Sequence, residues 1–300
     1  MNPERTGGST RPSNSMIRAP MLRIASKENP TFRRVLSIRA GKPEPIDGTL
    51  VLLEGFRLCE EALASGCRAL LLAFSETAAL DPRASTLRDF SAAEGPVVVF
   101  SDILFRRLCR TEEPQGFLLL CESPEIKGLP FAADPNGRYL VLEEIRDPGN
   151  IGTMLRTADA AGVTSVILTP GCVDPFNDKA LRASMGSVFH IPVHRAPLIE
   201  VSVWLHAAGL PLIAADLNGE GLFETEFPGK GAVLIGNEAE GLSRTALDCS
   251  DLRVSIPMPG RAESLNAAAA AAILVYEMLK TSDRGHEGAQ TAPGSNRKEG

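Results

Sequence analysis

The second half of this chain alternates between short apolar runs and segments with helical spacing, and this alternation restricts the possible folds more than any other feature. Strands that are separated by helices run parallel, and a parallel sheet is covered by helices on both faces. The pattern therefore predicts an α/β fold of this kind. The expected strands are 139–145, 165–169, 211–216, 231–236 and 252–256, with helices at about 151–161, 199–208, 243–248 and 264–280.

The composition of the 300 residues predicts two domains between two tails. Small and polar residues dominate both tails, which are expected to be disordered. A stretch with three prolines and two glycines suits a linker. The predicted order is a tail at 1–17, a smaller α/β domain at 18–122, the linker at 123–137, the larger domain at 138–282 and a second tail at 283–300.

The smaller domain shows fewer clear elements than the larger one. Three apolar runs of strand type lie at 49–54, 97–100 and 117–122. The segment 58–66 has helical spacing, and Gly66 at its end is a plausible C-cap. We therefore expect a mixed α/β unit of short elements.

Composition also excludes several classes of protein. No run reaches the roughly 18–20 apolar residues of a membrane span, and no apolar core follows the N-terminal arginines as it would in a secretory signal. The six cysteines form no C-x-x-C pair, and the four histidines have no spacing typical of metal ligands. We expect a cytoplasmic protein with buried, reduced cysteines, no membrane segment and no metal site.

Charge is unevenly distributed along the chain. The net charge is −6, but residues 1–45 hold nine Arg/Lys against three Glu, a local charge of +6 that leaves −12 for the remainder. A basic stretch on an acidic protein can bind nucleic acid, or it can be a solvated tail. Both interpretations stay open at this point.

Three segments place polar residues at the carboxyl ends of predicted strands, where open α/β sheets bind ligands. They are 143–163, 233–243 and 255–272. Each has a structural explanation of its own: a capped helix with a surface arginine, a strand-turn-helix with a carboxylate near the helix start, and an N-cap at Ser264. The glycine patterns of dinucleotide and P-loop sites are absent from the sequence, which argues against a Rossmann enzyme.

Taken together, the three segments resemble the signature motifs of the SpoU/TrmH family of RNA ribose 2′-O-methyltransferases. Residues 147–158 resemble D-P-x-N-x-G-x-x-x-R-T-A, residues 235–242 match I-G-N-E-x-x-G-L, and residues 256–266 contain I-P-M followed by S-L-N. The stretch 177–193 also looks like the family. The segments 25–38, 52–66 and 112–120 are similar, more weakly, to a substrate-binding domain found in many members.

Two positions depart from the family pattern. Glu143-Glu144 stands where the family often has Asp-Gly, and Ala267 stands where Val is common. Neither change removes a polar group from the motifs, so the departures bear on fine specificity more than on activity.

The resemblance implies a C-terminal domain with a deep trefoil knot, an exception to the rule that protein chains do not thread their own loops. It also implies that S-adenosylmethionine binds in the knot and that the catalytic site combines residues of two subunits in a homodimer. The residues expected to bind the cofactor are Leu234, Gly236, Asn237, Gly241, Ile256, Met258, Leu265 and Asn266.

The reaction implied by the resemblance is methyl transfer to a ribose 2′-hydroxyl. Arginine stays protonated in proteins, so Arg156 is expected to hold a phosphate and to stabilise the developing alkoxide. Four further residues would position the ribose and support this arginine: Asn150, Glu238, Ser264 and Asn266.

The expected partner is RNA, with ribosomal RNA favoured over transfer RNA because a substrate-binding domain precedes the catalytic one. Its predicted contacts in the basic stretch are Lys27, Arg33, Arg34 and Arg39. Two alternatives remain: a member of the family that binds RNA without catalysis, and a nucleotide-binding enzyme with an ordinary doubly wound sheet.

Overall fold

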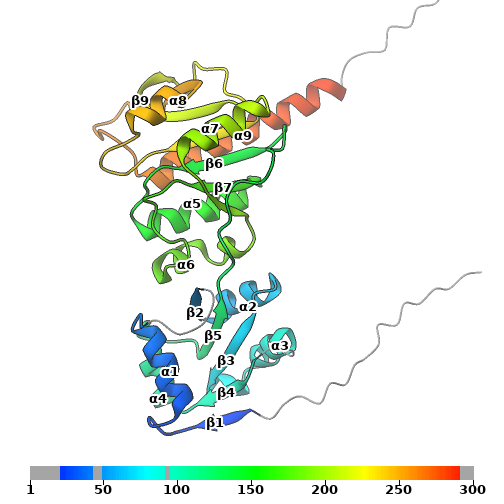
Figure 1. Cartoon of the computed structure of the whole chain (residues 1–300), viewed down its shortest axis with the longest axis vertical. Helices are drawn as coiled ribbons and strands as arrows, with labels where there is room; N and C mark the ends of the chain where they lie inside the picture. The colour runs from blue at the N-terminus through cyan, green and yellow to red at the C-terminus, as the bar shows by residue number, and fades with distance from the viewer. Residues whose placement is uncertain (1–20, 43–48, 92–94, 291–300) are drawn as a thin grey trace, which may run out of the picture.

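The computed structural model describes residues 21–42, 49–91 and 95–290 and contains two α/β domains, each built around one sheet (Figure 1). The segment between strand β5 and strand β6 connects the two domains and contains no helix or named strand. The expected tail at 1–17 and the last residues of the expected C-terminal tail lie outside the described residues.

The C-terminal sheet has six parallel strands in the order β11-β9-β10-β6-β7-β8. The predicted parallel sheet is therefore confirmed. Its strands are β6 (Arg138–Leu142), β7 (Ser165–Leu168), β8 (Val193–Arg195), β9 (Leu212–Gly221), β10 (Gly231–Ile235) and β11 (Leu252–Ser255). Its helices are α5 (Pro148–Ala160), α6 (Asp178–Ser184), η2 (Ser187–Phe189), α7 (Leu198–Ala207), α8 (Arg244–Cys249) and α9 (Ala267–Gln290).

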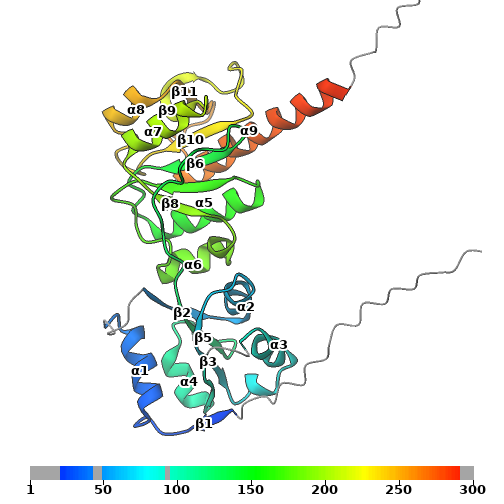
Figure 2. The same cartoon turned by 45° about the vertical axis from the view of Figure 1, so that its right-hand side comes forward.

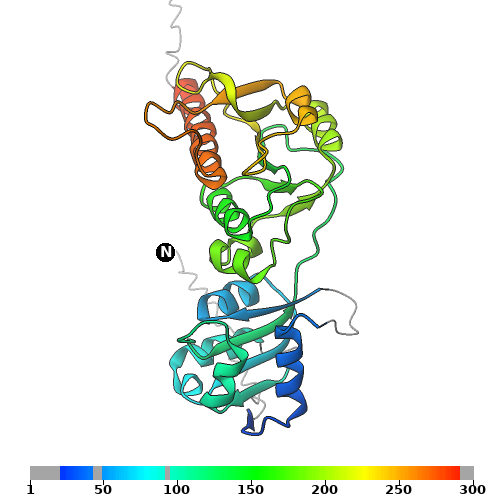
Figure 3. The same ribbon diagram turned by 90° about the vertical axis from the view of Figure 1, so that its left-hand side faces the viewer.

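Helices cover both faces of this sheet, as Figure 3 shows from the side. On β6, Leu140 and Leu142 belong to the core that includes residues of α5 and α9. The alternate residues Tyr139 and Val141 belong to the core that includes residues of α7 and α8. Successive side chains of a strand point to opposite faces, so a strand buried on both sides reads as a continuous apolar run.

The N-terminal sheet has the order β1-β4-β3-β5-β2, in which β5 runs antiparallel to both of its neighbours. Helices α1 and α4 share a core with one face of the sheet, and α2 and α3 share a core with the other. The strands are β1 (Leu22–Ile24), β2 (Leu50–Glu54), β3 (Ala69–Ser75), β4 (Val97–Phe100) and β5 (Phe117–Glu122). The helices are α1 (Pro30–Arg39), α2 (Phe56–Ala64), η1 (Ala78–Leu80), α3 (Pro82–Ser91) and α4 (Asp102–Leu108).

Several element boundaries differ from the predictions. Strand β9 continues to Gly221, because its far half pairs with β11 beyond a register shift. Helix α9 begins at Ala267, since the Asn266 side chain accepts hydrogen bonds from the N–H groups of Ala268 and Ala269 and thereby acts as the cap expected at Ser264. The same helix runs on to Gln290, into the segment expected to be disordered (Figure 2).

Polar contacts join the two domains. The Arg110 guanidinium on the N-terminal side lies 2.7 Å from the carboxylate of Asp178 at the start of α6. The His190 ring lies 3.0 Å from Glu61 of the N-terminal domain and 3.3 Å from Asp159 of the C-terminal domain. The domain contact is therefore charged on both sides.

Glu54 organises the N-terminal side of this contact. Its carboxylate lies 2.8 Å from the Arg39 guanidinium and accepts hydrogen bonds from the N–H groups of Arg110 and Thr111. Burial raises the pKa of Glu54, but these hydrogen bonds outweigh it and leave the pKa below its ordinary value.

This shift predicts a pH-dependent contribution to stability. Because the folded-state pKa is lowered, the ionised carboxylate should stabilise the protein above about pH 4.5, and that stability should be lost as the pH falls through the folded pKa. Glu54→Gln should therefore reduce the free energy of unfolding by about 1–2 kcal/mol at pH 7. Urea unfolding should show that the difference in free energy of unfolding between wild type and Glu54→Gln shrinks below about pH 4.5. A difference that grows as the pH falls would contradict the lowered pKa of Glu54.

No helix in the described ranges has the length and apolar character needed to cross a membrane. Among the same residues, no cluster of three or more His, Cys, Asp or Glu side chains is arranged to hold a metal ion. All six cysteines are free, and Cys59, Cys121 and Cys172 are buried.

Candidate active site

A cavity of about 330 Å³ opens at the carboxyl ends of β10 and β11, beside residues 215–217 in the middle of β9. Three loops line it: the turn after β10, the segment after β11 and the residues that lead into α9. The predicted site residues that line it are Gly236, Asn237, Glu238, Gly241, Ile256, Met258, Ser264 and Leu265. Sequence segments far apart in the chain therefore meet at one end of the sheet.

The cavity walls combine aliphatic side chains with backbone groups. Ile235, Val254 and Ile256 form part of the lining, and Leu217 and Leu265 are exposed at it. The volume lies within the range of ligand pockets, about 300–1,000 Å³. Aliphatic side chains can cover a planar base, and backbone groups at strand ends can hydrogen-bond its edge, so the lining fits an adenosine-like group.

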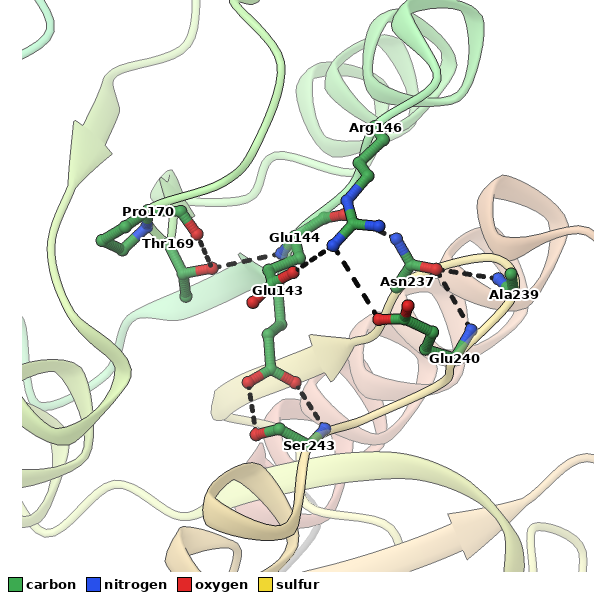
Figure 4. A network of polar contacts seen from close by, with 9 residues as sticks. All are labelled: Glu143, Glu144, Arg146, Thr169, Pro170, Asn237, Ala239, Glu240 and Ser243. Carbon is green, nitrogen blue, oxygen red and sulfur yellow. Dashed lines mark hydrogen bonds and ion pairs between the residues drawn. The ribbon is translucent and has the colours of Figure 1, made fainter.

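The turn after β10 is folded by its own side chain. Asn237 is 8% exposed, and its Oδ1 accepts hydrogen bonds from the N–H groups of Ala239 and Glu240 at 2.9 and 3.1 Å. Its Nδ2 donates to the backbone oxygen of Glu144 at 2.9 Å. Figure 4 shows this connection between the turn and the end of β6. Asn237 therefore shapes the wall of the cavity.

Gly236 is required by the same turn. A Cβ at this position would lie 2.5 Å from the backbone carbon and oxygen of Gly241. The sequence predicts Gly236 as a cofactor-binding residue, and the atoms nearest to such a Cβ belong to the turn itself. A side chain at position 236 would therefore deform the cavity wall.

Three residues from the three motifs form one hydrogen-bonded chain. Asn266 Nδ2 donates to Asn150 Oδ1 at 2.9 Å, and Asn150 Nδ2 donates to Glu238 Oε1 at 2.8 Å. Because Asn266 Oδ1 caps α9, its Nδ2 is the donor, and this in turn fixes the amide orientation of Asn150. Asn150 and Asn266 do not line the cavity themselves but hold Glu238 beside it.

Helix α5 begins at the centre of this arrangement. Asp147 is its N-cap and accepts the N–H of Asn150 at 2.9 Å, and Pro148 occupies the first turn, where its missing N–H costs nothing. Lys179 of α6 lies 2.6 Å from the same carboxylate. The hydrogen bond from Lys179, together with the N–H of Asn150, lowers the pKa of Asp147.

Arg156 lies away from the cavity. It is exposed on α5, does not line the cavity, and makes no hydrogen bond or ion pair with any residue that the structure describes. Six residues separate it from Asn150, which corresponds to about 240° around a helix. The structure of one chain thus keeps Arg156 apart from the other predicted catalytic residues.

Two of the predicted site residues lie outside the surfaces that the prediction assigned to them. Leu234 is fully buried among side chains that pack toward α7 and does not line the cavity. Arg39 has a side chain only 9% exposed and pairs with Glu54, so it is not placed to contact a phosphate. The sequence conceals this burial because the carboxylate partner lies fifteen residues away.

The other predicted RNA contacts lie at or near the surface of the N-terminal domain. Lys27 is exposed in the turn before α1, and Arg33 is exposed on α1 and paired with Glu28. Arg34 is half-buried on the same helix. Helix α4 packs against α1 and adds two exposed arginines that sequence analysis missed, Arg106 and Arg107. Sequence analysis missed these arginines because they lie far along the chain from the basic stretch at residues 1–45.

The end of β6 holds further residues that were not predicted. Glu144 has a φ of +51°, in the left-handed region that costs a non-glycine residue about 1–2 kcal/mol. This is the position at which the family often has glycine. Asp216, the last residue of the strand predicted at 211–216, and Leu217 after it line the cavity as well. The polar residue at the end of that predicted strand was an available signal.

Comparison with known proteins identifies the family. The SpoU rRNA Methylase family model matches residues 137–276, and the MRM3-like substrate binding domain model matches residues 47–119. The 23S rRNA (guanosine(2553)-2′-O)-methyltransferase RlmP of Bacillus subtilis is 36% identical over 260 residues, which cover 86% of this chain and 99% of that protein. This chain belongs to the SpoU rRNA methylase family.

Solved structures of SpoU methyltransferases share the fold of most of the chain. The rRNA methyltransferase of Sinorhizobium meliloti matches with a TM-score of 0.75 at 28% identity, covering 87% of this chain and 98% of that one. AviRb of Streptomyces viridochromogenes, in complex with AdoMet, matches with a TM-score of 0.71 at 29% identity, covering 84% and 98%. Both domains of the SpoU methylase described here therefore have counterparts in these structures.

Proposed function

We propose that this SpoU methylase transfers a methyl group from S-adenosylmethionine to a ribose 2′-hydroxyl of ribosomal RNA. The observation that carries the proposal is the hydrogen-bonded chain Asn266–Asn150–Glu238, which joins all three motifs beside the cavity. The RlmP relative is a 23S rRNA 2′-O-methyltransferase, and the AviRb structure holds AdoMet. The trefoil knot implied by family membership stays a prediction.

The cavity provides the cofactor site in this proposal. S-adenosylmethionine supplies a methyl group on an electrophilic sulfonium when it is bound. Leu265 and Met258 would cover the adenine, and the backbone near Gly236 and Ile256 would hydrogen-bond its edge. Glu238 would face the reacting ribose, held in place by Asn150.

Transfer requires a weakly acidic hydroxyl to lose its proton while its oxygen stays in line with the methyl group. Glu238 and Ser264 line the cavity and would orient the ribose. Arg156 would bind the adjoining phosphate and stabilise negative charge on the 2′-oxygen, because a guanidinium forms two parallel hydrogen bonds to an anion.

A homodimer is part of the proposal, because one chain does not bring Arg156 to the cavity. A second copy would supply this arginine across an interface. Helix α9 carries apolar side chains suited to such a contact, since Ile273 and Tyr276 are 38% and 48% exposed one turn apart. A cytoplasmic location, which suits an enzyme that modifies ribosomal RNA, also belongs to the proposal.

The second candidate is a member that binds RNA without catalysis. The intact chain of Asn266, Asn150 and Glu238 argues against it. Incubation with labelled S-adenosylmethionine and RNA transcribed in vitro separates the two, because transcripts carry no modifications. Label in 23S rRNA transcripts, with little in transfer RNA transcripts, would support the proposal. Cofactor binding without label in any RNA would favour the second candidate, and label confined to transfer RNA would reassign the substrate.

We also propose that RNA binds to the outer side of α1 and α4. Removing one cationic side chain that touches a phosphate should flatten the plot of log affinity against log salt by roughly 0.7–0.9. Changing Arg33 and Arg107 together to Ala should therefore reduce this slope by about 1–2 units and leave cofactor affinity unchanged.

The matched control changes Arg57 and Arg68 of the same domain to Ala. Both are exposed, with side chains 66% and 61% accessible, and both pair with carboxylates away from the α1–α4 surface. Filter binding across a salt series measures both double variants. Equal slopes for the two would place the RNA on another surface.

A further inference from the structure

We propose that Glu143 and Glu144 are positioning residues that clamp the cofactor loop, residues 237–243, to the end of β6, and that affinity for S-adenosylmethionine depends on this clamp. The inference rests on the proposed function, since it assumes that the cavity holds this cofactor. It concerns the Glu-Glu pair that stands where the family often has Asp-Gly (Figure 4).

Glu143 holds the far end of the loop. Its side chain is buried, and its two carboxylate oxygens accept hydrogen bonds from the Ser243 N–H at 2.9 Å and the Ser243 hydroxyl at 2.7 Å. Ser243 is also the N-cap of α8, where its Oγ accepts the N–H of Ala246. The buried side chain of Glu143 thus fixes the residue at which the loop ends and the next helix begins.

Glu144 holds the near end through its backbone. Its N–H donates to Thr169 Oγ1 at 3.2 Å, and its oxygen accepts from Asn237 Nδ2 at 2.9 Å. The left-handed φ of Glu144 presents both groups to these partners. Strained backbone persists only where the surroundings hold it, and here Thr169 and Asn237 of the cofactor loop hold it.

The side chain of Glu144 reaches the middle of the loop. Its Oε2 lies 2.7 Å from Arg146 Nη2, and the same nitrogen lies 3.8 Å from Glu240 Oε2. Glu240 lines the cavity. The Glu144 side chain also rests on Gly171, where an added Cβ would lie 3.1 Å from its Cγ. Glycine at position 144 would adopt the left-handed φ without strain, but it would lose the bridge through Arg146 to Glu240.

The clamp gives the loop its shape before the cofactor arrives. A binding loop that is already ordered spends less of the binding free energy on ordering. Because the bridge through Arg146 is exposed to solvent, its contribution should be modest, about two- to five-fold in affinity. The cofactor affinity should therefore respond to Glu144 even though the fold does not need its side chain.

The test compares Glu144→Gly with Met185→Gly. These are the two non-glycine residues with left-handed φ in the described parts of the chain, at +51° and +53°, and Met185 ends α6 away from the cavity. Removing the strain should raise the melting temperature of both variants by about 1–3 °C. Calorimetry should show S-adenosylmethionine affinity falling about two- to five-fold in Glu144→Gly alone. Its KM for the cofactor should rise in the same way, with kcat at saturating cofactor unchanged.

A second pair separates the side-chain bridge from the backbone. Arg146→Met should weaken cofactor binding by a similar factor, whereas Arg68→Met, which removes an exposed 2.8 Å ion pair outside the site, should not. If Glu144→Gly and Arg146→Met both bound the cofactor as tightly as the wild type, that result would overturn the clamp. Wild-type protein that binds no S-adenosylmethionine would overturn the proposed function and the inference with it.

Discussion

Arg156→Ala should lower kcat by at least ~10²-fold, the scale of losing one donor to the transition state. Cofactor affinity should stay close to wild type, because Arg156 does not line the cavity. Arg156→Lys should recover little, since an ammonium group cannot reproduce the planar fork of a guanidinium. Single-turnover methylation under saturating cofactor measures the effect.

Arg138→Ala is the matched control for this variant. Arg138 is the first residue of β6, at the end of the sheet opposite the cavity, and its guanidinium donates a hydrogen bond to the Gly162 carbonyl. The turnover of the Arg138→Ala variant should remain near that of the wild type. Near-normal single-turnover methylation by Arg156→Ala would remove this arginine from the site.

Gly236→Val should reduce S-adenosylmethionine affinity by more than about 100-fold, because a side chain there would collide with the backbone of Gly241. The expected loss comes from a deformed cofactor loop, so the unfolding temperature should change much less than the affinity. Gly128→Val is the control, since a Cβ at Gly128 has no heavy atom within 4 Å. Normal calorimetric binding by folded Gly236→Val would contradict the structure of the loop.

These two variants together test whether the site is shared between subunits. In a mixed dimer, the intact cavity of the Arg156→Ala chain would meet the intact arginine of the Gly236→Val chain. Equal mixing with random exchange should then restore about a quarter of the wild-type activity. A site contained within one chain would gain nothing from mixing.

The sequence predicted the C-terminal sheet well because its strands are buried on both faces and read as continuous apolar runs. In the N-terminal domain, β1 has only three residues, and α1 and α4 are short helices, far apart in sequence, that pack on the same face of the sheet. Such elements carry little periodic signal. Their outlines therefore emerged only from the structure.

The sequence predicted those residues of the candidate site that belong to the three motifs. Eight of the predicted residues line one cavity, and Asn150 and Asn266 support it. The errors came from relations that no local pattern encodes. Arg39 of helix α1 pairs with the carboxylate of Glu54 on strand β2. Gly236 is needed because the backbone of Gly241 packs against it.

The product of this enzyme should carry a methyl group on a ribose 2′-oxygen of ribosomal RNA. Alkaline hydrolysis tests it directly, because cleavage needs a free 2′-hydroxyl at each step. After reaction with labelled S-adenosylmethionine and 23S rRNA transcript, the label should appear in alkali-resistant dinucleotides and should disappear with Arg156→Ala. Label recovered in mononucleotides would mean methylation of a base and would contradict 2′-O-methylation by this enzyme.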